Sequence, residues 1–255
     1  MARARRGEDT HFGFRTVGRE QKAGLVRQVF DSVADRYDLM NDLMSAGVHR
    51  LWKMALIDWL NPRPPMHLLD VAGGTGDVAL RFLARTGGAQ AGARVTVCDL
   101  SPAMLEIGRD RALDRGQVSG IEWVAGDAEA LPIGDASVDA VTVAYGLRNV
   151  TDLGRALAEA RRVLRPGGRF LCLEFSRVAI APLDRLYEAY SFHVLPALGE
   201  LVTGDRAAYQ YLVESIRRFP DQRRFAAAIA ETGLGNVKYR DLTGGIAALH
   251  SAWRI

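Results

Sequence analysis

The sequence predicts an α/β protein built on a doubly wound, mostly parallel sheet of seven strands that ends in an antiparallel hairpin. Short apolar runs alternate with segments of helical periodicity through the middle of the chain, which is the pattern of successive strand–helix units. A glycine-rich turn follows the first of these runs. Near the C-terminus, two strand-like runs flank Thr243-Gly244-Gly245, a turn that is typical of a hairpin.

The chain has 255 residues, of which 48% are hydrophobic, and this is enough apolar material for one large domain. Residues 1–20 include several arginines and are expected to form a mobile basic arm. Residues 21–60 are expected to form a helical lid, because apolar residues recur at steps of three and four. Residues 61–255 then form the main domain, with a helical insert at about 177–220.

The order of elements after residue 61 follows from the same periodicities. The five expected parallel strands are residues 67–71, 94–98, 121–124, 138–144 and 169–175. The helices between and after them are expected at 78–84, 104–113, 153–164, 177–218 and 223–232. The last two strands of the sheet come from the terminal hairpin.

Composition excludes several classes of protein. No window reaches the roughly 18 apolar residues of a membrane span, and the first residues lack the apolar segment of a signal peptide. The expected location is therefore cytoplasmic, with peripheral contact at the inner face of the membrane left open. The net charge of +3 is mild, so no nucleic-acid partner is expected. Cys98 and Cys172 lie in apolar runs and are expected to be buried thiols, and no metal site is expected.

The turn after the first strand is the expected cofactor site. Asp70 closes the strand, and the turn Gly73-Gly74-Thr75-Gly76 leads into a helix. Glycine lets the backbone turn tightly and approach a ligand, and the helix N-terminus offers unpaired N–H groups. The same residues satisfy a loose dinucleotide-binding pattern, so an NAD-dependent oxidoreductase stays open on this motif alone.

Acidic residues follow the next two strands. Asp99 ends the second strand, where a carboxylate can accept both hydroxyls of a ribose, and Asp127-Ala128 follows the third, where an acid suits an adenine amino group. A Pro166-Gly167-Gly168 turn precedes the fifth strand. This order resembles the Rossmann-like class I methyltransferases, which implies S-adenosyl-L-methionine as cofactor. Ala72 stands where many of them have glycine, and no loss of binding is expected from one methyl group.

Two long segments resemble a particular family. YDLMNDLMSAGVHRLW (Tyr37–Trp52) and RVLRPGGRFLCLEFS (Arg162–Ser176) are similar to the two signatures of the ubiquinone/menaquinone biosynthesis C-methyltransferases, the UbiE family. The similarity runs from about His11 to the C-terminus. It implies methylation of a ring carbon of a polyprenylated quinol: 2-methoxy-6-polyprenyl-1,4-benzoquinol, demethylmenaquinol, or both. Another small molecule or an RNA is the alternative acceptor, although no Pro-Pro motif of amino-group methylases follows the fourth strand.

This resemblance suggests roles for residues near the cofactor. Arg148 and Asn149 follow the fourth strand at its carboxyl end, where ligands bind in open parallel sheets. Arg148 is expected to stabilise a phenolate, and the alternative is an ion pair with an acid such as Asp152. The proton goes to water or to one of three side chains, Asp38, His49 or His193.

The lid and the acceptor tail complete the expectations. Tyr37, Asp38, Asn41 and His49 are expected to close over the cofactor and the quinol, unless Gly47 breaks the helix. Tyr145 and His193 are further candidate substrate contacts, and for His193 a place in the core is equally expected. A polyprenyl tail implies contact with a membrane surface. A homodimer and contact with other quinone-biosynthesis enzymes stay open.

Overall fold

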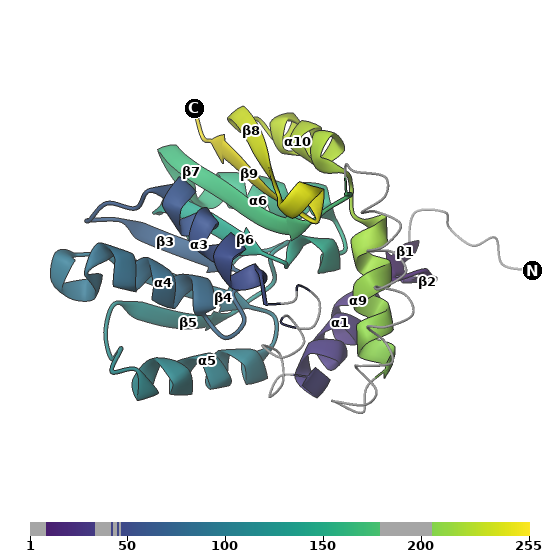
Figure 1. Cartoon of the computed structure of the whole chain (residues 1–255), viewed down its shortest axis with the longest axis horizontal. Helices are drawn as coiled ribbons and strands as arrows, with labels where there is room; N and C mark the ends of the chain where they lie inside the picture. Colours follow the sequence, from purple (N-terminus) through teal and green to yellow (C-terminus); the bar gives the residue numbers. More distant parts are fainter. Residues whose placement is uncertain (1–8, 34–41, 43–44, 46, 179–205) are drawn as a thin grey trace, which may run out of the picture.

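The computed structural model describes residues 9–33, 42, 45, 47–178 and 206–255, and its centre is a seven-stranded sheet (Figure 1). The order across the sheet is β5-β4-β3-β6-β7-β9-β8. Strands β3 to β7 are parallel, and β9 pairs antiparallel with both β7 and β8. Their bounds are β3 His67–Val71, β4 Arg94–Asp99, β5 Ile121–Ala125, β6 Val138–Ala144, β7 Leu164–Phe175, β8 Gly235–Leu242 and β9 Ala247–Trp253. The predicted fold class is confirmed.

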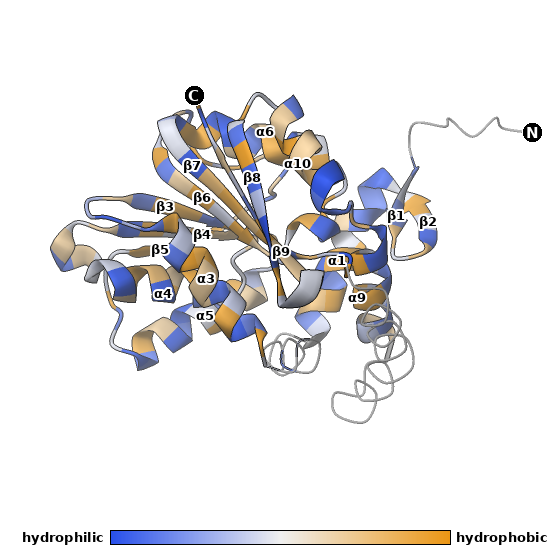
Figure 2. Ribbon diagram, turned by 45° about the horizontal axis from the view of Figure 1, so that its top comes forward, coloured by the Kyte–Doolittle hydropathy of each residue, from blue (hydrophilic) through white to orange (hydrophobic). Residues whose placement is uncertain are grey.

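Helices cover both faces of this sheet. One hydrophobic core contains residues of α3 (His49–Leu60) and α4 (Asp77–Thr86), and the other contains residues of α6 (Leu153–Val163) and α10 (Gln222–Glu231). Helix α5 (Pro102–Asp114) lies beside β4 and β5 (Figure 1). Hydrophobic residues concentrate along the central strands β6 and β7, whereas the edge strand β8 is more hydrophilic (Figure 2). This difference follows burial, since both faces of a central strand are covered and an edge strand is partly exposed.

The strands follow local sequence closely because apolar runs bounded by polar turns specify them. Strand β7 differs, since it begins at Leu164 instead of residue 169 and therefore contains the Pro166-Gly167-Gly168 turn. Its pairing with β6 shifts register between Val138 and Ala140. The irregularity lets the strand bend before its continuous pairing with β6 resumes at Arg169.

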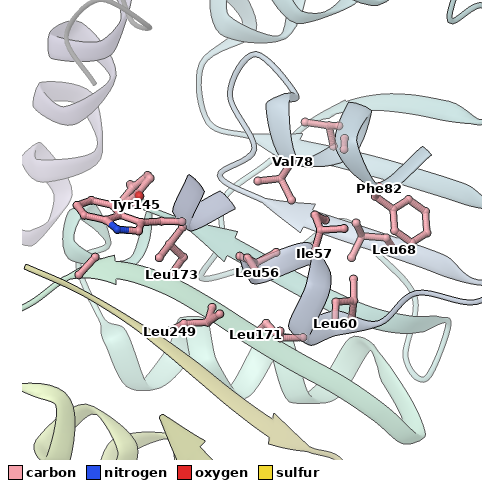
Figure 3. Close-up of a cluster of buried hydrophobic side chains, with 14 of the residues drawn as sticks. Leu56, Ile57, Leu60, Leu68, Val78, Phe82, Tyr145, Leu171, Leu173 and Leu249 are labelled. Atoms are coloured by element: carbon pink, nitrogen blue, oxygen red, sulfur yellow. The ribbon is translucent and has the colours of Figure 1, made fainter. Parts of the chain in front are cut away.

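In the described part of the chain, the segment predicted as a helical lid contains α1 (Arg19–Val33) and α3, and Asp42 and Ser45 between them are also helical. Gly47 lies in a turn at φ +78° just before α3, so the break that its presence suggested is confirmed. Helix α3 packs on the sheet as scaffold. Leu56, Ile57 and Leu60 point toward Leu68 of β3 and Leu171 of β7 in the close-up (Figure 3). Each such side chain stabilises the fold by about 1.5–3 kcal/mol through burial.

Residues 1–20 were expected to form a mobile basic arm, but within them residues 9–18 form a hairpin of β1 (Asp9–Phe12) and β2 (Arg15–Gly18). The hairpin contacts helix α9 (Arg206–Arg218), which lies far away in the sequence. The Phe12 ring stacks on Tyr211 with centroids 4.1 Å apart, and the Phe14 N–H donates to Glu214 Oε2 at 2.8 Å. Tertiary contact therefore orders a segment whose own sequence does not require it.

Both cysteines are buried thiols inside strands, as predicted. Burial raises the pKa of Cys98 to about 12 and raises that of Cys172 well above its ordinary value. Among the described residues, no group of three or more His, Cys, Asp or Glu side chains could hold a metal ion. No helix of that same part of the chain is long and apolar enough to cross a membrane.

Candidate active site

A cleft lies at the carboxyl ends of the parallel strands. Six of the predicted site residues line it: Gly74, Asp99, Asp127, Ala128, Tyr145 and Asn149. Ala72 lines it as well. The structure therefore brings together side chains from the ends of β3, β4, β5 and β6, because parallel strands all end at the same edge of the sheet.

Asp99 is the most extensively bonded acid of the cleft. Its Oδ2 accepts the Gly74 N–H at 2.8 Å and its Oδ1 accepts the Ser101 N–H at 2.9 Å. Burial raises the pKa of this carboxyl, and the two backbone N–H groups oppose that shift. Both oxygens keep further lone pairs, so the carboxylate can accept two hydroxyls of a ribose while it fixes the glycine turn.

The glycine turn is shaped by close neighbours. Gly76 has φ +73°, and a Cβ there would lie 2.5 Å from the Trp123 ring. Gly74 has φ +54° and faces Met104. Only glycine occupies such positions without strain. Gly74 therefore brings the backbone of the turn to the cleft with no side chain in between.

Ala72 also has a positive φ, of +51°, which costs an alanine more than a glycine. Its methyl group faces Gly146 on the loop after β6, where a Cβ would lie 2.4 Å from the Ala72 Cβ. The methyl group at position 72 is thus accommodated by the absence of a side chain at position 146. Both residues line the cleft.

This pair gives a testable coupling. Gly146→Ala is expected to lower the free energy of unfolding by about 1–3 kcal/mol through overpacking. Ala72→Gly removes the opposing methyl group, so the double variant is expected to be more stable than Gly146→Ala alone. Urea denaturation of the four proteins measures the coupling. Purely additive effects would show that the two positions do not contact each other.

Asp127 and Ala128 lie where the sequence placed them. The Asp127 Oδ1 accepts the Glu129 N–H at 2.8 Å, which holds the short turn after β5 in shape. Leu131 fixes the end of that turn, because its side chain is buried and its N–H donates to Glu159 Oε2 at 2.8 Å. An acid on a fixed turn at this edge suits the amino group of an adenine.

Asp70 lies beneath the glycine turn and is 1% exposed. Its Oδ1 accepts the Thr142 hydroxyl at 2.7 Å, whereas its Oδ2 has no hydrogen-bond partner among the described residues. Burial raises the pKa of Asp70 to about 7. An unpaired buried carboxylate oxygen at this point fits a ligand that carries a positive charge or an N–H group.

The raised pKa of Asp70 predicts a pH dependence of stability. The folded carboxyl keeps its proton up to about pH 7, while the unfolded one loses it near pH 4. The folded state thus binds more protons between these values, so stability falls as pH rises, by about 4 kcal/mol in all. Asp70→Asn is expected to remove this part of the dependence. Urea denaturation from pH 4.5 to 7.5 measures it, and parallel curves for the two proteins would contradict the assignment.

The loop after β6 carries Arg148 and Asn149. Arg148 Nη1 donates to Glu174 Oε1 and to the Tyr145 carbonyl, each at 2.6 Å. The two charged side chains are 1% and 2% exposed. Burial raises the pKa of Glu174 and the Arg148 charge opposes that shift. Arg148 therefore forms an ion pair, which was the alternative to contact with a phenolate. Its partner is Glu174 and not Asp152, which pairs with Arg19 at 2.9 Å. Direct contact of Arg148 with a phenolate stays a prediction.

Two predicted residues face another cavity, of about 530 Å³, among α3, α4 and α5. His49 lies there, 3% exposed, with Nε2 at 2.8 Å from Asp42 Oδ1. Burial lowers its pKa. The Thr75 hydroxyl accepts from Arg111 Nη1 at 3.2 Å on the same side. The structure does not bring His49 and Thr75 to the lining of the cleft at the strand ends. Tyr37, Asp38, Asn41 and His193 lie outside the described residues.

Helix α1 forms one wall of the cleft, and none of its residues was predicted as a site residue. Ala23, Val26, Arg27 and Phe30 line it. These positions recur at steps of three and four, so one face of the helix is turned toward the ligand space. The apolar stripe was visible in the sequence, but a stripe facing a cleft has the same spacing as one facing a core.

The fold of this chain and its family together identify it as a class I S-adenosylmethionine-dependent methyltransferase. Solved structures share the fold: a methyltransferase from Aquifex aeolicus (TM-score 0.58, 13% identity, 80% of this chain and 89% of that one) and phosphoethanolamine N-methyltransferase 2 from Haemonchus contortus (TM-score 0.64, 13% identity, 90% and 60%). The model of the ubiE/COQ5 methyltransferase family matches residues 15–254, and the chain belongs to this family.

Curated relatives agree with the family over nearly the whole chain. The ubiquinone/menaquinone biosynthesis C-methyltransferase UbiE of Paracoccus denitrificans is 59% identical, covering 97% of this chain and 98% of the relative. The protein of the same name from Brucella anthropi is 52% identical, covering 99% and 95%. Membership of a methyltransferase family decides against the NAD-dependent oxidoreductase that the glycine turn alone left open.

Proposed function

We propose that this protein transfers the methyl group of S-adenosylmethionine to a ring carbon of a polyprenylated quinol in ubiquinone and menaquinone biosynthesis. The acceptor is 2-methoxy-6-polyprenyl-1,4-benzoquinol, demethylmenaquinol, or both. The observation that carries the proposal is the identity of 52–59% over nearly the full chain with relatives named for this reaction. The cleft at the carboxyl edge of the sheet supports it, because its donor and acceptor groups fit both the cofactor and a quinol.

The residues of the cleft fit S-adenosylmethionine part by part. Asp99 would hold the ribose hydroxyls and Asp127 the adenine amino group, while the glycine turn lets the ligand approach the backbone. The unpaired Oδ2 of Asp70 would face the ammonium end, directly or through a water.

Bound there, the cofactor supplies an electrophilic methyl group on a positively charged sulfur. The new bond joins that methyl carbon to a ring carbon of the quinol, the carbon–sulfur bond breaks, and a neutral thioether leaves. The ring carbon then loses its proton to restore aromaticity. A ring carbon beside an ionised hydroxyl is the better nucleophile, so the site must orient the ring and stabilise a phenolate.

We assign contact with the ring to the loop after β6. Asn149 lines the cleft and presents a carboxamide, and Tyr145 lines it beside Gly146. Arg148 holds this loop from behind through the Tyr145 carbonyl and Glu174. We infer that Asn149 contacts the acceptor and that Arg148 keeps the loop in place. The polyprenyl tail motivates a further part of the proposal, peripheral binding at the inner face of the membrane.

Methylation of defined quinols tests the proposal. The purified protein is incubated with S-adenosylmethionine carrying a labelled methyl group and with each of the two chemically reduced acceptors in detergent. We expect the label to appear on a ring carbon of at least one acceptor, as read by mass spectrometry. The matched control is the Asp99→Ala protein. If neither quinol is labelled while S-adenosylmethionine binds normally, the proposed acceptor class is wrong.

A further inference from the structure

The carboxamide of Asn149 is held at both ends. Its Oδ1 accepts the Tyr211 hydroxyl at 2.9 Å, and its Nδ2 is 3.4 Å from the Tyr145 carbonyl oxygen. Asn149 itself lines the cleft on the loop after β6. Tyr211 lies on α9 and lines a different cavity together with Leu147 and Arg148 of that loop. A helix more than sixty residues later in the chain (|i−j| = 62) therefore fixes the orientation of a side chain in the cleft.

Tyr211 is well suited to fix an orientation. It is 4% exposed, and its ring stacks on Phe12 of the N-terminal hairpin at 4.1 Å. Burial raises the pKa of Tyr211, so the hydroxyl keeps its proton at neutral pH and can donate. The Phe14 N–H and the Glu214 carboxylate tie the same hairpin to α9 at 2.8 Å. A rotation of the Tyr211 ring would disrupt these packed contacts.

The direction of this hydrogen bond decides what Asn149 offers to a ligand. A carboxamide has one accepting oxygen and two N–H donors. The Tyr211 hydroxyl takes the oxygen, and the Tyr145 carbonyl lies within reach of one N–H. The other N–H has no partner among the described residues. The group that Asn149 presents to the cleft is thus a donor, which is what an oxyanion requires.

We propose that Tyr211 is a positioning residue for the methyl transfer. Its hydroxyl orients the Asn149 carboxamide so that an N–H points into the cleft and donates to the ionised oxygen of the acceptor. The proposal rests on the proposed function, since it assumes an acceptor that reacts as a phenolate. Under this proposal, turnover depends on Tyr211 although Tyr211 does not line the cleft.

Tyr211→Phe tests the role of the hydroxyl while it preserves the ring that stacks on Phe12. We expect kcat to fall about tenfold, with the Kd for S-adenosylhomocysteine unchanged, because a misoriented donor stabilises the oxyanion less well. The acid limb of the pH profile of kcat should move to higher pH, because the acceptor ionises less readily without the donor. A merely structural role would leave this limb in place.

Ser215→Ala is the matched control. Ser215 lies one turn further along α9, is 5% exposed, and donates its hydroxyl to the Leu212 carbonyl at 2.8 Å within the same helix. Its loss removes a buried hydroxyl from α9 without touching Asn149. We expect wild-type kcat and an unshifted pH profile for this protein.

A double-variant cycle shows whether Tyr211 acts through Asn149. Asn149→Ala is expected to lower kcat by about a hundredfold, and adding Tyr211→Phe should lower it no further. Asn149→Asp keeps an acceptor for Tyr211 but offers no N–H, so it should lose as much as Asn149→Ala. This variant tests the donor even if Tyr211→Phe does not fold.

The outcomes separate the two proposals. Additive effects of Tyr211→Phe and Asn149→Ala, an unchanged kcat in Tyr211→Phe, or wild-type turnover in Asn149→Asp would overturn the positioning role. Wild-type protein that methylates neither quinol would instead overturn the proposed function. Each reading therefore uses the wild-type rate measured in the same preparation.

Discussion

Replacing Asp99 with alanine is expected to weaken S-adenosylmethionine binding about a hundredfold. The substitution removes the proposed acceptor for the ribose hydroxyls and leaves the Gly74 and Ser101 N–H groups without their bonds of 2.8 and 2.9 Å. A buried polar group that loses its partner costs about 1–3 kcal/mol, and about 1.4 kcal/mol corresponds to a factor of ten. Isothermal titration calorimetry with S-adenosylhomocysteine measures the effect without turnover.

Asp114→Ala is the control for this experiment. Asp114 is the last residue of α5 and is exposed, whereas Asp99 is nearly buried in the cleft. The control should bind S-adenosylhomocysteine as the wild type does, and far-ultraviolet circular dichroism should show that both variants are folded. A Kd for Asp99→Ala within about threefold of the wild-type value would exclude Asp99 as a main cofactor contact.

The second large effect concerns the buried pair Arg148–Glu174. Arg148→Met is expected to lower the free energy of unfolding by about 3–5 kcal/mol, because it leaves the Glu174 charge without its partner at 2.6 Å. The loss should be smaller at pH 5 than at pH 8. Without Arg148 the pKa of Glu174 rises further, and a protonated carboxyl is less costly to bury. Urea denaturation at the two pH values measures both parts.

Arg148→Met combined with Glu174→Leu removes both charges and is expected to restore most of the lost stability. This double variant also separates the two roles of Arg148. Turnover that returns with stability would mean that Arg148 holds the loop. Restored stability with low turnover would mean that its charge acts on the acceptor. A single variant as stable as the wild type would contradict the importance of the pair.

The strands were predictable to within one or two residues at most of their ends, and the strand-end acids lie together as expected. Apolar runs and glycine turns are local signals, and the parallel arrangement then brings strand ends to one edge. Asp99 and Asp127 could therefore be placed in the cleft without a structure. The sequence showed that α1 has an apolar face. The spacing of the apolar residues could not show whether that face packs on the core or lines the cleft.

The contacts that remained hidden join segments far apart in the chain. Glu174 is the one acid in the apolar run RFLCLEF, and a buried charge requires a partner. That signal could have suggested an ion pair between Glu174 of β7 and Arg148 on the loop after β6. Nothing comparable marks the bond from Tyr211 to Asn149 or the hairpin on α9, because each depends on how distant helices pack.

The two strand cysteines have a practical consequence. Cys98 and Cys172 are 1% and 0% exposed, and burial raises both pKa values, so the folded protein presents almost no thiolate to a reagent. Alkylation therefore requires that the strand carrying the thiol open to solvent. Cys98 reports on β4, which ends at the cleft, and Cys172 reports on β7 in the middle of the sheet. The rates at which the two thiols are alkylated therefore measure local and global opening of the molecule, and no cysteine has to be introduced.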